Sequence, residues 1–188
     1  MNLTIITPCS RPENLVKMAN TIPEGVRWIV VFDMEPLPLI MAVIPSNCEY
    51  YFLKNHSMGY PQSNIGIEMV KDGYLYFLDD DTFLHPNLIQ TMESILKYGT
   101  FDFIHFDQTG PSWEHRIGGV VKKGAIDKGS FIVSRQLVGT TRFHMPHHSD
   151  GDFAVECYKK SKNPLYIHKY LSIYNALRPE HPDIPKFK

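Results

Sequence analysis

Three consecutive carboxylates, Asp79, Asp80 and Asp81, directly follow the apolar run YLYFL. Unpaired like charges at the end of a buried strand would repel one another and lower stability. A divalent cation removes this cost, because magnesium and manganese take oxygen ligands and use one or two carboxylates together with substrate phosphates. The triplet therefore predicts a site for Mn²⁺ or Mg²⁺ and a phosphate-bearing ligand. The alternative is a solvated acidic turn before the helix that Pro86 begins.

The segments around the triplet alternate between strand and helix. Apolar and β-branched runs predict four strands, at residues 3–7, 26–32, 49–53 and 74–78. Helices are predicted at residues 12–20, which begin at a proline, and at residues 62–71. Such alternation is typical of right-handed βαβ units in an open α/β sheet, whose ligands bind beyond the carboxyl ends of the strands. Asp33 and the triplet both follow predicted strands, so we expect them to meet at one edge.

The second half of the chain is less regular. After the triplet, helices are expected at residues 86–98 and 151–160, and strands at residues 101–106, 118–121, 130–133 and 165–171. From residue 178 to residue 188 three prolines predict an extended or mobile tail.

Composition narrows the class of protein. With 188 residues and 43% hydrophobic content, we expect one domain spanning residues 1–188. Lys and Arg number 19 against 20 for Asp and Glu, so the net charge of -1 gives no general attraction to nucleic acid or anionic membranes. The three scattered cysteines favour reduced thiols in a cytoplasmic protein. The N-terminus does not resemble a signal peptide, and we expect no transmembrane segment.

The segment YLYFLDDDTFLHPN resembles the Asp-x-Asp motif of the glycosyltransferase A superfamily, and the chain resembles its small family 2 members. The resemblance implies a single-domain, Rossmann-like, open and mostly parallel sheet flanked by helices. It also implies that Asp79 and Asp80 contact the nucleotide-sugar, with Asp80 on the ribose. Asp81 and Asp79 would hold Mn²⁺ or Mg²⁺ against the diphosphate. Residues 1–107 would then bind the nucleotide-sugar, and residues 108–177 would face the acceptor.

Further residues match this resemblance in chain order. A Pro-containing loop after the first strand and an Asp after the second hold the base in family 2, which implies this role for Thr7, Pro8, Arg11 and Asp33. The segment MGYPQSNIG resembles the family's Gly and Asn stretch, with Gly59, Asn64 and Gly66 in place and Ser63 where an Arg is usual. His168 is similar to the late-strand histidine that lies beside the diphosphate or metal, although a structural histidine is the alternative.

The second half has a looser similarity to the animal glucuronyltransferases. Trp113, Arg116 and Asp127 precede Gly129 and Phe131 in an order like that of the acceptor-facing segment of those enzymes. The similarity implies that these three residues bind the acceptor, where the Asp127 carboxylate would accept hydrogen bonds from hydroxyl groups. The alternative for Asp127 is a turn residue beside Gly129.

A glycosyltransferase that inverts the anomeric centre needs a general base beside the acceptor hydroxyl. In family 2 an acidic pair opens a helix and its second acid is the base; the segment SDGDF resembles it, with Asp150 as the first candidate and Asp152 as the second. Both could instead be acids that stabilise a helix N-terminus.

The resemblance implies metal-dependent transfer of a sugar from a nucleotide-sugar, with UDP favoured, to a hydroxyl of a glycan or glycoprotein. A nucleotidyltransferase is one alternative, although TPCSRPEN provides only Arg11 where such enzymes carry a Gly-rich basic signature. A non-catalytic nucleotide- or sugar-binding module is the other.

Overall fold

The computed structural model describes residues 1–33, 38–42, 44–53, 59–110, 115–116, 119–144 and 149–178, with only the backbone at 39, 40, 115 and 116. The strands are β1 (Leu3–Cys9), β2 (Arg27–Phe32), β3 (Glu49–Phe52), β4 (Tyr74–Phe77), β5 (Phe83–Leu84), β6 (Phe103–Thr109), β7 (His115–Arg116), β8 (Phe131–Ser134) and β9 (Pro164–Ile173). The helices are η1 (Pro12–Asn14), α1 (Leu15–Ala19), α2 (Pro38–Met41), α3 (Tyr60–Glu68), α4 (Leu88–Leu96), η2 (Lys128–Ser130), α5 (Arg135–Val138) and α6 (Ser149–Lys160), of which η1 and η2 are 3₁₀ helices.

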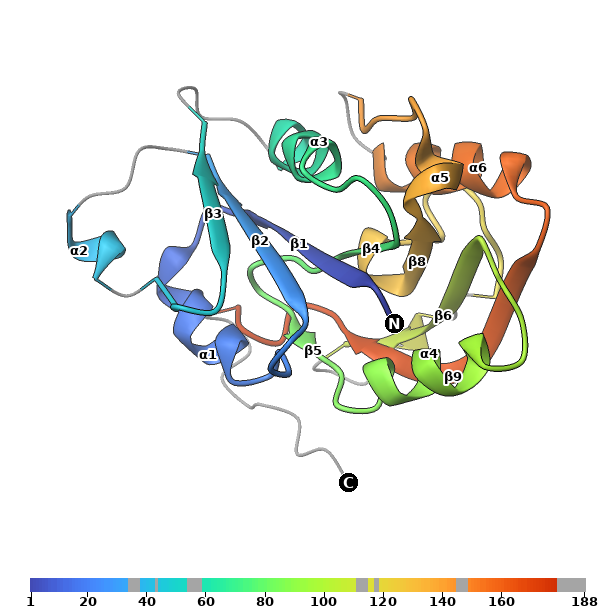
Figure 1. Cartoon of the computed structure of the whole chain (residues 1–188), viewed down its shortest axis with the longest axis horizontal. Coiled ribbons are helices and arrows are strands. Elements are labelled where there is room, and N and C mark those ends of the chain that lie inside the picture. The colour runs from blue at the N-terminus through green and yellow to red at the C-terminus, as the bar shows by residue number, and fades with distance from the viewer. Residues whose placement is uncertain are drawn as a thin grey trace.

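These strands form one sheet in the order β3-β2-β1-β4-β8-β6-β9-β5, with β7 paired to β6 (Figure 1). Strand β1 pairs in parallel with β2 and β4, and β2 pairs in parallel with β3. Strand β8 is antiparallel to both β4 and β6, while β9 is parallel to β6. Six of the nine described strands therefore run in one direction, which confirms the predicted open and mostly parallel α/β sheet.

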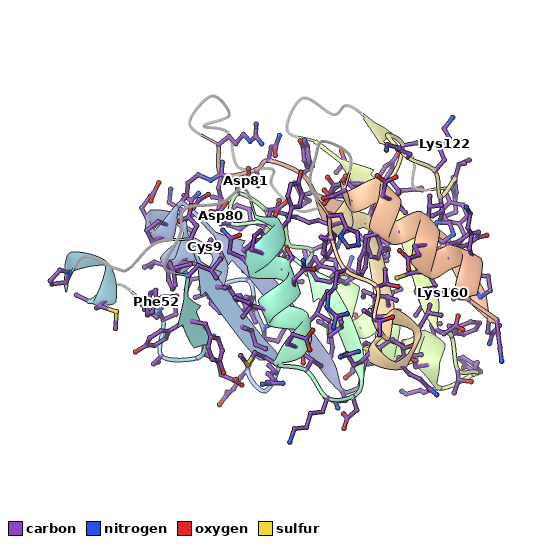
Figure 2. The ribbon with its side chains drawn as sticks, turned by 90° about the horizontal axis from the view of Figure 1, so that it is seen from above. Cys9, Phe52, Asp80, Asp81, Lys122 and Lys160 are labelled. Atoms are coloured by element: carbon purple, nitrogen blue, oxygen red, sulfur yellow. The ribbon has the colours of Figure 1, made fainter. Side chains whose placement is uncertain are left out.

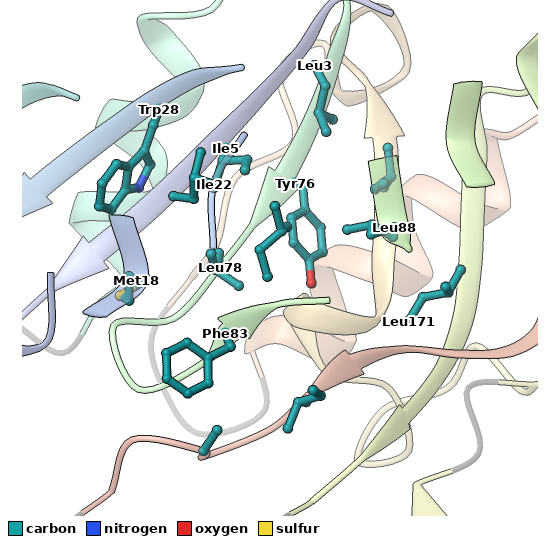
Figure 3. Packing of buried hydrophobic residues seen from close by; sticks show 14 of the residues in the cluster. Leu3, Ile5, Met18, Ile22, Trp28, Tyr76, Leu78, Phe83, Leu88 and Leu171 are labelled. Carbon is teal, nitrogen blue, oxygen red and sulfur yellow. The ribbon is translucent and has the colours of Figure 1, made fainter. Parts of the chain in front are cut away.

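The core consists of two apolar clusters, one on each face of the sheet. Successive strand residues point to opposite faces. Ile5 and Tyr76 therefore lie with Met18 in the cluster covered by α1 and α4, as Figure 3 shows. Ile6 and Phe77 lie in the other cluster, which α3, α5 and α6 cover. Figure 1 shows α3 and the α1–α4 pair on opposite sides of the sheet. This three-layer arrangement leaves the carboxyl ends of β1, β2 and β4 as a common edge.

Most predicted elements are present, with shifted ends. Helix α3 begins at Tyr60, two residues before the predicted start, because Pro61 suits the first turn of a helix. The strand predicted at residues 118–121 is wrong, since residues 119–121 form a turn and a loop. Two consecutive glycines at 118 and 119 weaken any strand there, although Gly118 itself lies outside the described residues. Residues 179–188 of the predicted tail also lie outside them.

Gly66 allows α3 to approach β1 closely. A Cβ atom at this position would collide with the side chain of Ile6. We expect Gly66→Ala to lower the free energy of unfolding by about 1–3 kcal/mol through overpacking. Urea unfolding measures this loss, with Gly99→Ala as control, because a Cβ at Gly99 would meet the ring of Phe101 at 3.4 Å. Equal midpoints for the two variants would contradict the close approach.

Two general features bear on the class of protein. All three cysteines, Cys9, Cys48 and Cys157, are free. Among the described residues, no helix combines the length and the apolar character that crossing a membrane requires.

Candidate functional site

A cavity of about 480 Å³ lies at the carboxyl ends of β1, β2 and β4. Its lining residues come from the loops after these strands, from η2, α3 and α6, and from the turn after β9: Pro8, Ser10, Arg11, Asp33, Gly59, Gln62, Asp79, Asp80, Asp81, Asp127, Lys128, Asp150, Tyr174, Asn175 and Arg178. Figure 2 shows Asp80 and Asp81 beside Cys9, the last residue of β1. The volume is typical of a small-molecule site.

A larger hollow of about 780 Å³ lies between α4 and β9. His85, Gln90 and Tyr170 line it, and none of its described lining residues is a carboxylate. The smaller cavity is therefore the candidate site, because the charged groups converge there.

Asp80 ties the loop after β1 to the end of β4. Its Oδ2 accepts hydrogen bonds from the backbone N–H groups of Ser10 (2.6 Å) and Arg11 (2.7 Å). Its Oδ1 accepts from Nε (2.9 Å) and Nη2 (2.5 Å) of Arg11, and Asn14 Nδ2 donates to its backbone oxygen (3.0 Å). These donors fill the roughly four lone-pair positions of the buried carboxylate. Asp80 therefore fixes the loop that carries Arg11, and its contact with a ribose stays a prediction.

Asp81 is shared by two arginines. Its Oδ2 lies 2.9 Å from Nη2 of Arg11 and accepts a hydrogen bond from Nε of Arg178 (2.9 Å). Thr82 Oγ1 donates a longer hydrogen bond to Oδ1 (3.3 Å), and the backbone N–H of Leu177 donates to the backbone oxygen of Asp81 (2.8 Å). The Asp81 side chain is 3% exposed, against 37% for Arg178. Arg178, the first residue of the tail predicted from the sequence, is therefore part of this site.

Lys128 enters from η2 and pairs with Asp79. Its Nζ lies 2.6 Å from Asp79 Oδ1, and its side chain is 8% exposed. Burial raises the pKa of Asp79 to about 7, although the charge of Lys128 lowers it; the charges of Asp127 and Asp150 add to the rise. Burial lowers the pKa of Lys128, but the charges of Asp79 and Asp150 raise it above its ordinary value. The ammonium therefore stays charged among several carboxylates.

Asp127 and Asp150 flank this lysine. Asp127 Oδ1 accepts hydrogen bonds from the backbone N–H of Gly129 (2.9 Å) and from Gln108 Nε2 (3.2 Å), so this residue caps η2 and also lines the cavity. Asp150 lies in the first turn of α6, and its buried Oδ1 has no hydrogen-bond partner among the described residues. Burial raises the pKa of Asp150. The charge of Lys128 acts against this rise, and the charge of Asp127 adds to it. Such a carboxylate can accept a proton from a ligand hydroxyl.

A divalent cation fits the charge of the cavity. Among the described residues, six carboxylates and three cationic side chains line it, so their formal charges sum to minus three when all of them are ionised. Among the described residues, no three His, Cys, Asp or Glu side chains form a preassembled metal site. Magnesium and manganese need no such group, because they commonly use one or two carboxylates together with the phosphates of a ligand. Asp81 and Asp79 are the residues that would hold it.

Nine of the residues singled out in the sequence come together around this cavity: Pro8, Arg11, Asp33, Gly59, Asp79, Asp80, Asp81, Asp127 and Asp150. Asp33 is buried directly after β2. Gly59 precedes α3 with a positive φ of 71°, a conformation that favours glycine.

Thr7 and Asn64 do not line the cavity, because each has a structural partner. Thr7 is buried, and its Oγ1 accepts a hydrogen bond from Trp28 Nε1 (2.9 Å) in the core. Asn64 Nδ2 donates to the backbone oxygen of Phe143 and Oδ1 accepts from its backbone N–H, both at 2.9 Å. Asn64 thus joins α3 to the segment before α6.

Asp152 and His168 also lie away from the cavity. Asp152 is 54% exposed and pairs with Lys123 on the surface (2.9 Å), because it lies two residues beyond Asp150 on α6 and so points elsewhere. His168 Nδ1 lies 2.9 Å from the Tyr166 hydroxyl and 3.3 Å from Asp107 Oδ2.

Two of the predicted acceptor residues, Trp113 and Arg116, belong to the 111–118 region. Trp113 lies outside the described residues. Arg116 belongs to β7, but its side chain is outside the described part of the chain.

Six lining residues were missed from the sequence: Ser10, Gln62, Lys128, Tyr174, Asn175 and Arg178. Two signals could have found some of them. Lys128 directly follows Asp127, and a cation beside a candidate acid is a natural partner for other carboxylates. Ala176 and Leu177 are apolar and buried, so the chain before Arg178 is anchored rather than a free tail.

Comparisons with known proteins agree with this architecture. No protein-family profile and no curated protein matches the sequence. Among solved structures, residues 1–349 of S. aureus TarS match at 14% identity with a TM-score of 0.73, covering 94% of this chain and 61% of TarS 1–349. The complex of TarS 1–349 with UDP-GlcNAc matches at 13% identity with a TM-score of 0.74, covering 96% of this chain and 60% of that one.

A mannosyltransferase, PcManGT from Pyrobaculum calidifontis, in complex with GDP-Man and Mn²⁺, matches at 9% identity with a TM-score of 0.69. The match covers 96% of this chain and 58% of the mannosyltransferase, so the chain spans about 60% of the length of these structures. The similarities confirm the fold implied by the resemblance to the glycosyltransferase A superfamily.

Proposed function

We propose that this chain is a glycosyltransferase that moves a sugar from a nucleotide-sugar to a hydroxyl group of a glycan or glycoprotein. The observation that carries the proposal is the polarity of the cavity. Arg11 and Arg178 lie with Asp80 and Asp81 at an arginine end of no net formal charge, and Lys128 lies with Asp79, Asp127 and Asp150 at an acidic end. A fold shared with glycosyltransferases supports the same function.

The arginine end suits the diphosphate of the donor, because guanidinium groups bind phosphate oxygens in pairs of hydrogen bonds. Asp33 at the end of β2 suits the nucleobase of the donor, because its carboxylate can accept hydrogen bonds from the N–H groups of the base. We propose UDP as the nucleotide, supported by the complex of TarS with UDP-GlcNAc. Gly59 lies beside Lys128, since a Cβ there would be 3.9 Å from the ammonium.

The acidic end suits the acceptor. Asp150 would take the proton of the acceptor hydroxyl as its oxygen attacks the anomeric carbon opposite the diphosphate, which gives inversion. Asp127 would accept a hydrogen bond from a neighbouring hydroxyl group. Lys128 would hold Asp79 and Asp150 in one cavity despite their like charges. A bound Mn²⁺ or Mg²⁺ ion would offset the charge on the leaving diphosphate, and PcManGT with GDP-Man and Mn²⁺ supports such an ion.

A panel of nucleotide-sugars tests this function. A ligand that binds only the native state raises the melting temperature, so the true donor should stabilise the chain, and EDTA should reduce the shift. Release of nucleoside diphosphate with an acceptor then measures transfer. Stabilisation without release would favour a binding module, and release of pyrophosphate from a nucleoside triphosphate would favour a nucleotidyltransferase. No stabilisation by any nucleotide-sugar would refute the proposal.

Two further proposals accompany this function. Residues 108–177 form the acceptor-side half of a single domain, supported by the positions of Asp127, Lys128 and Asp150. The protein works in the cytoplasm, supported by its three free cysteines.

A further inference from the structure

Two guanidinium groups converge on a single carboxylate oxygen in the candidate site. Both Arg11 Nη2 and Arg178 Nε lie 2.9 Å from Asp81 Oδ2. The two arginines repel each other, and Arg178 shares its Asp81 oxygen with Arg11, which also has Asp80 as a partner. A second anion near Arg178 would relieve this repulsion.

The two arginines are anchored differently. Asp80 holds Arg11 through the backbone N–H, Nε and Nη2, so Arg11 keeps these hydrogen bonds if Asp81 binds something else. Arg178 extends from the turn after β9, and its side chain is 37% exposed. Its guanidinium can therefore turn within the cavity while Arg11 stays in place.

The turn that carries Arg178 is fixed independently of that side chain. The backbone N–H groups of Tyr174 and Leu177 donate to the backbone oxygens of Thr109 and Asp81, both at 2.8 Å. Asn175, at the centre of the turn, has a strained positive φ of 56°, and its buried Oδ1 has no hydrogen-bond partner. The turn thus presents the Arg178 cation to the cavity, which Asn175 also lines.

We propose that Arg178 and the divalent cation are alternative partners of Asp81, and that Arg178 turns to the diphosphate of the donor when the cation binds. This inference rests on the proposed function. Without ligand, Arg178 neutralises the buried carboxylate. With donor and ion present, the ion takes the carboxylate, and the guanidinium donates two hydrogen bonds to phosphate oxygens. No covalent bond changes in this exchange.

The test measures two ligands separately on the full chain by isothermal titration. Arg178→Gln removes the charge and keeps a polar side chain. Mn²⁺ alone should bind this variant at least about fivefold more tightly, because Asp81 loses a competing cation. UDP in saturating Mn²⁺ should bind it about tenfold more weakly, because the charged hydrogen bonds to phosphate are lost. UDP in EDTA should bind the variant and the wild type alike, because without the cation Arg178 stays on Asp81. Arg178→Lys keeps the charge, so its affinities for Mn²⁺ and for UDP should lie between those of Arg178→Gln and the wild type.

Arg142→Gln is the matched control, because Arg142 is paired with Glu68 away from the cavity and this variant should leave both affinities unchanged. Thermal unfolding verifies that each variant is folded. Weaker Mn²⁺ binding by Arg178→Gln, or unchanged affinity for both ligands, would overturn the inference while the proposed function stands. If the wild-type chain binds no nucleoside diphosphate, with or without Mn²⁺, the proposed function and this inference fail together.

Discussion

Asp150→Asn should reduce the rate of sugar transfer about 100- to 10,000-fold, which is the usual contribution of a general base. The amide keeps the size of the side chain but cannot take a proton. Donor affinity should stay unchanged, because Arg11 and Arg178 at the other end of the cavity would hold the diphosphate. Release of nucleoside diphosphate measures the rate, and isothermal titration with the donor measures the affinity.

Asp152→Asn is the control, because Asp152 lies two residues further along α6 and pairs with Lys123 on the surface. Its rate should stay within about a factor of two of the wild type, since exposed ion pairs contribute little. A similar loss in both variants would indicate a defect of α6 rather than of a base. A fully active Asp150→Asn variant would exclude Asp150 as the base.

The pH dependence of the wild-type rate tests independently whether Asp150 is the general base. A base works only when ionised, and burial raises the pKa of Asp150. The rate should therefore rise with pH through a midpoint above the ordinary aspartate pKa, which is about 3.9. The residual activity of Asp150→Asn should lack this rise. A wild-type rate that is flat from about pH 4 upward would contradict the assignment.

The edge of the sheet that carries the site could be predicted because its sequence signals are local. The strands before Asp33 and Asp79 are continuous apolar runs, and parallel strands bring their carboxyl ends together. The face of a side chain was harder to predict. Every residue of β1 is buried, so no polar alternation indicates that Thr7 turns to Trp28 rather than to the cavity.

The missed residues reach the site through long-range pairing. Lys128 meets Asp79 because β8, which follows η2, is antiparallel to β4. Arg178 meets Asp81 because β9 pairs with both β6 and β5 and so brings the following turn over the triplet. Sequence periodicity does not encode these pairings, and the prolines after Arg178 suggested a tail instead.

Lys128→Met should lower the free energy of unfolding by about 3–5 kcal/mol at pH 8, because it leaves buried carboxylates without their cation. Methionine replaces the aliphatic stem, so lost packing contributes little. Urea unfolding in EDTA measures the loss. Lys123→Met is the matched control, since Lys123 is 57% exposed, and it should change stability by at most about 1 kcal/mol.

The destabilisation of Lys128→Met should depend on pH with a definite sign. Asp79, with a pKa of about 7, and Asp150 are both raised above their unfolded values. Such groups favour folding below their unfolded pKa near 4, and this advantage is lost as pH rises through the folded pKa. Removing Lys128 raises both pKa values further, so the gap to the wild type should be small near pH 4 and widen above neutral pH. A gap of constant size would mean that Lys128 acts through packing, because only the loss of its charge makes the penalty grow as the carboxylates ionise.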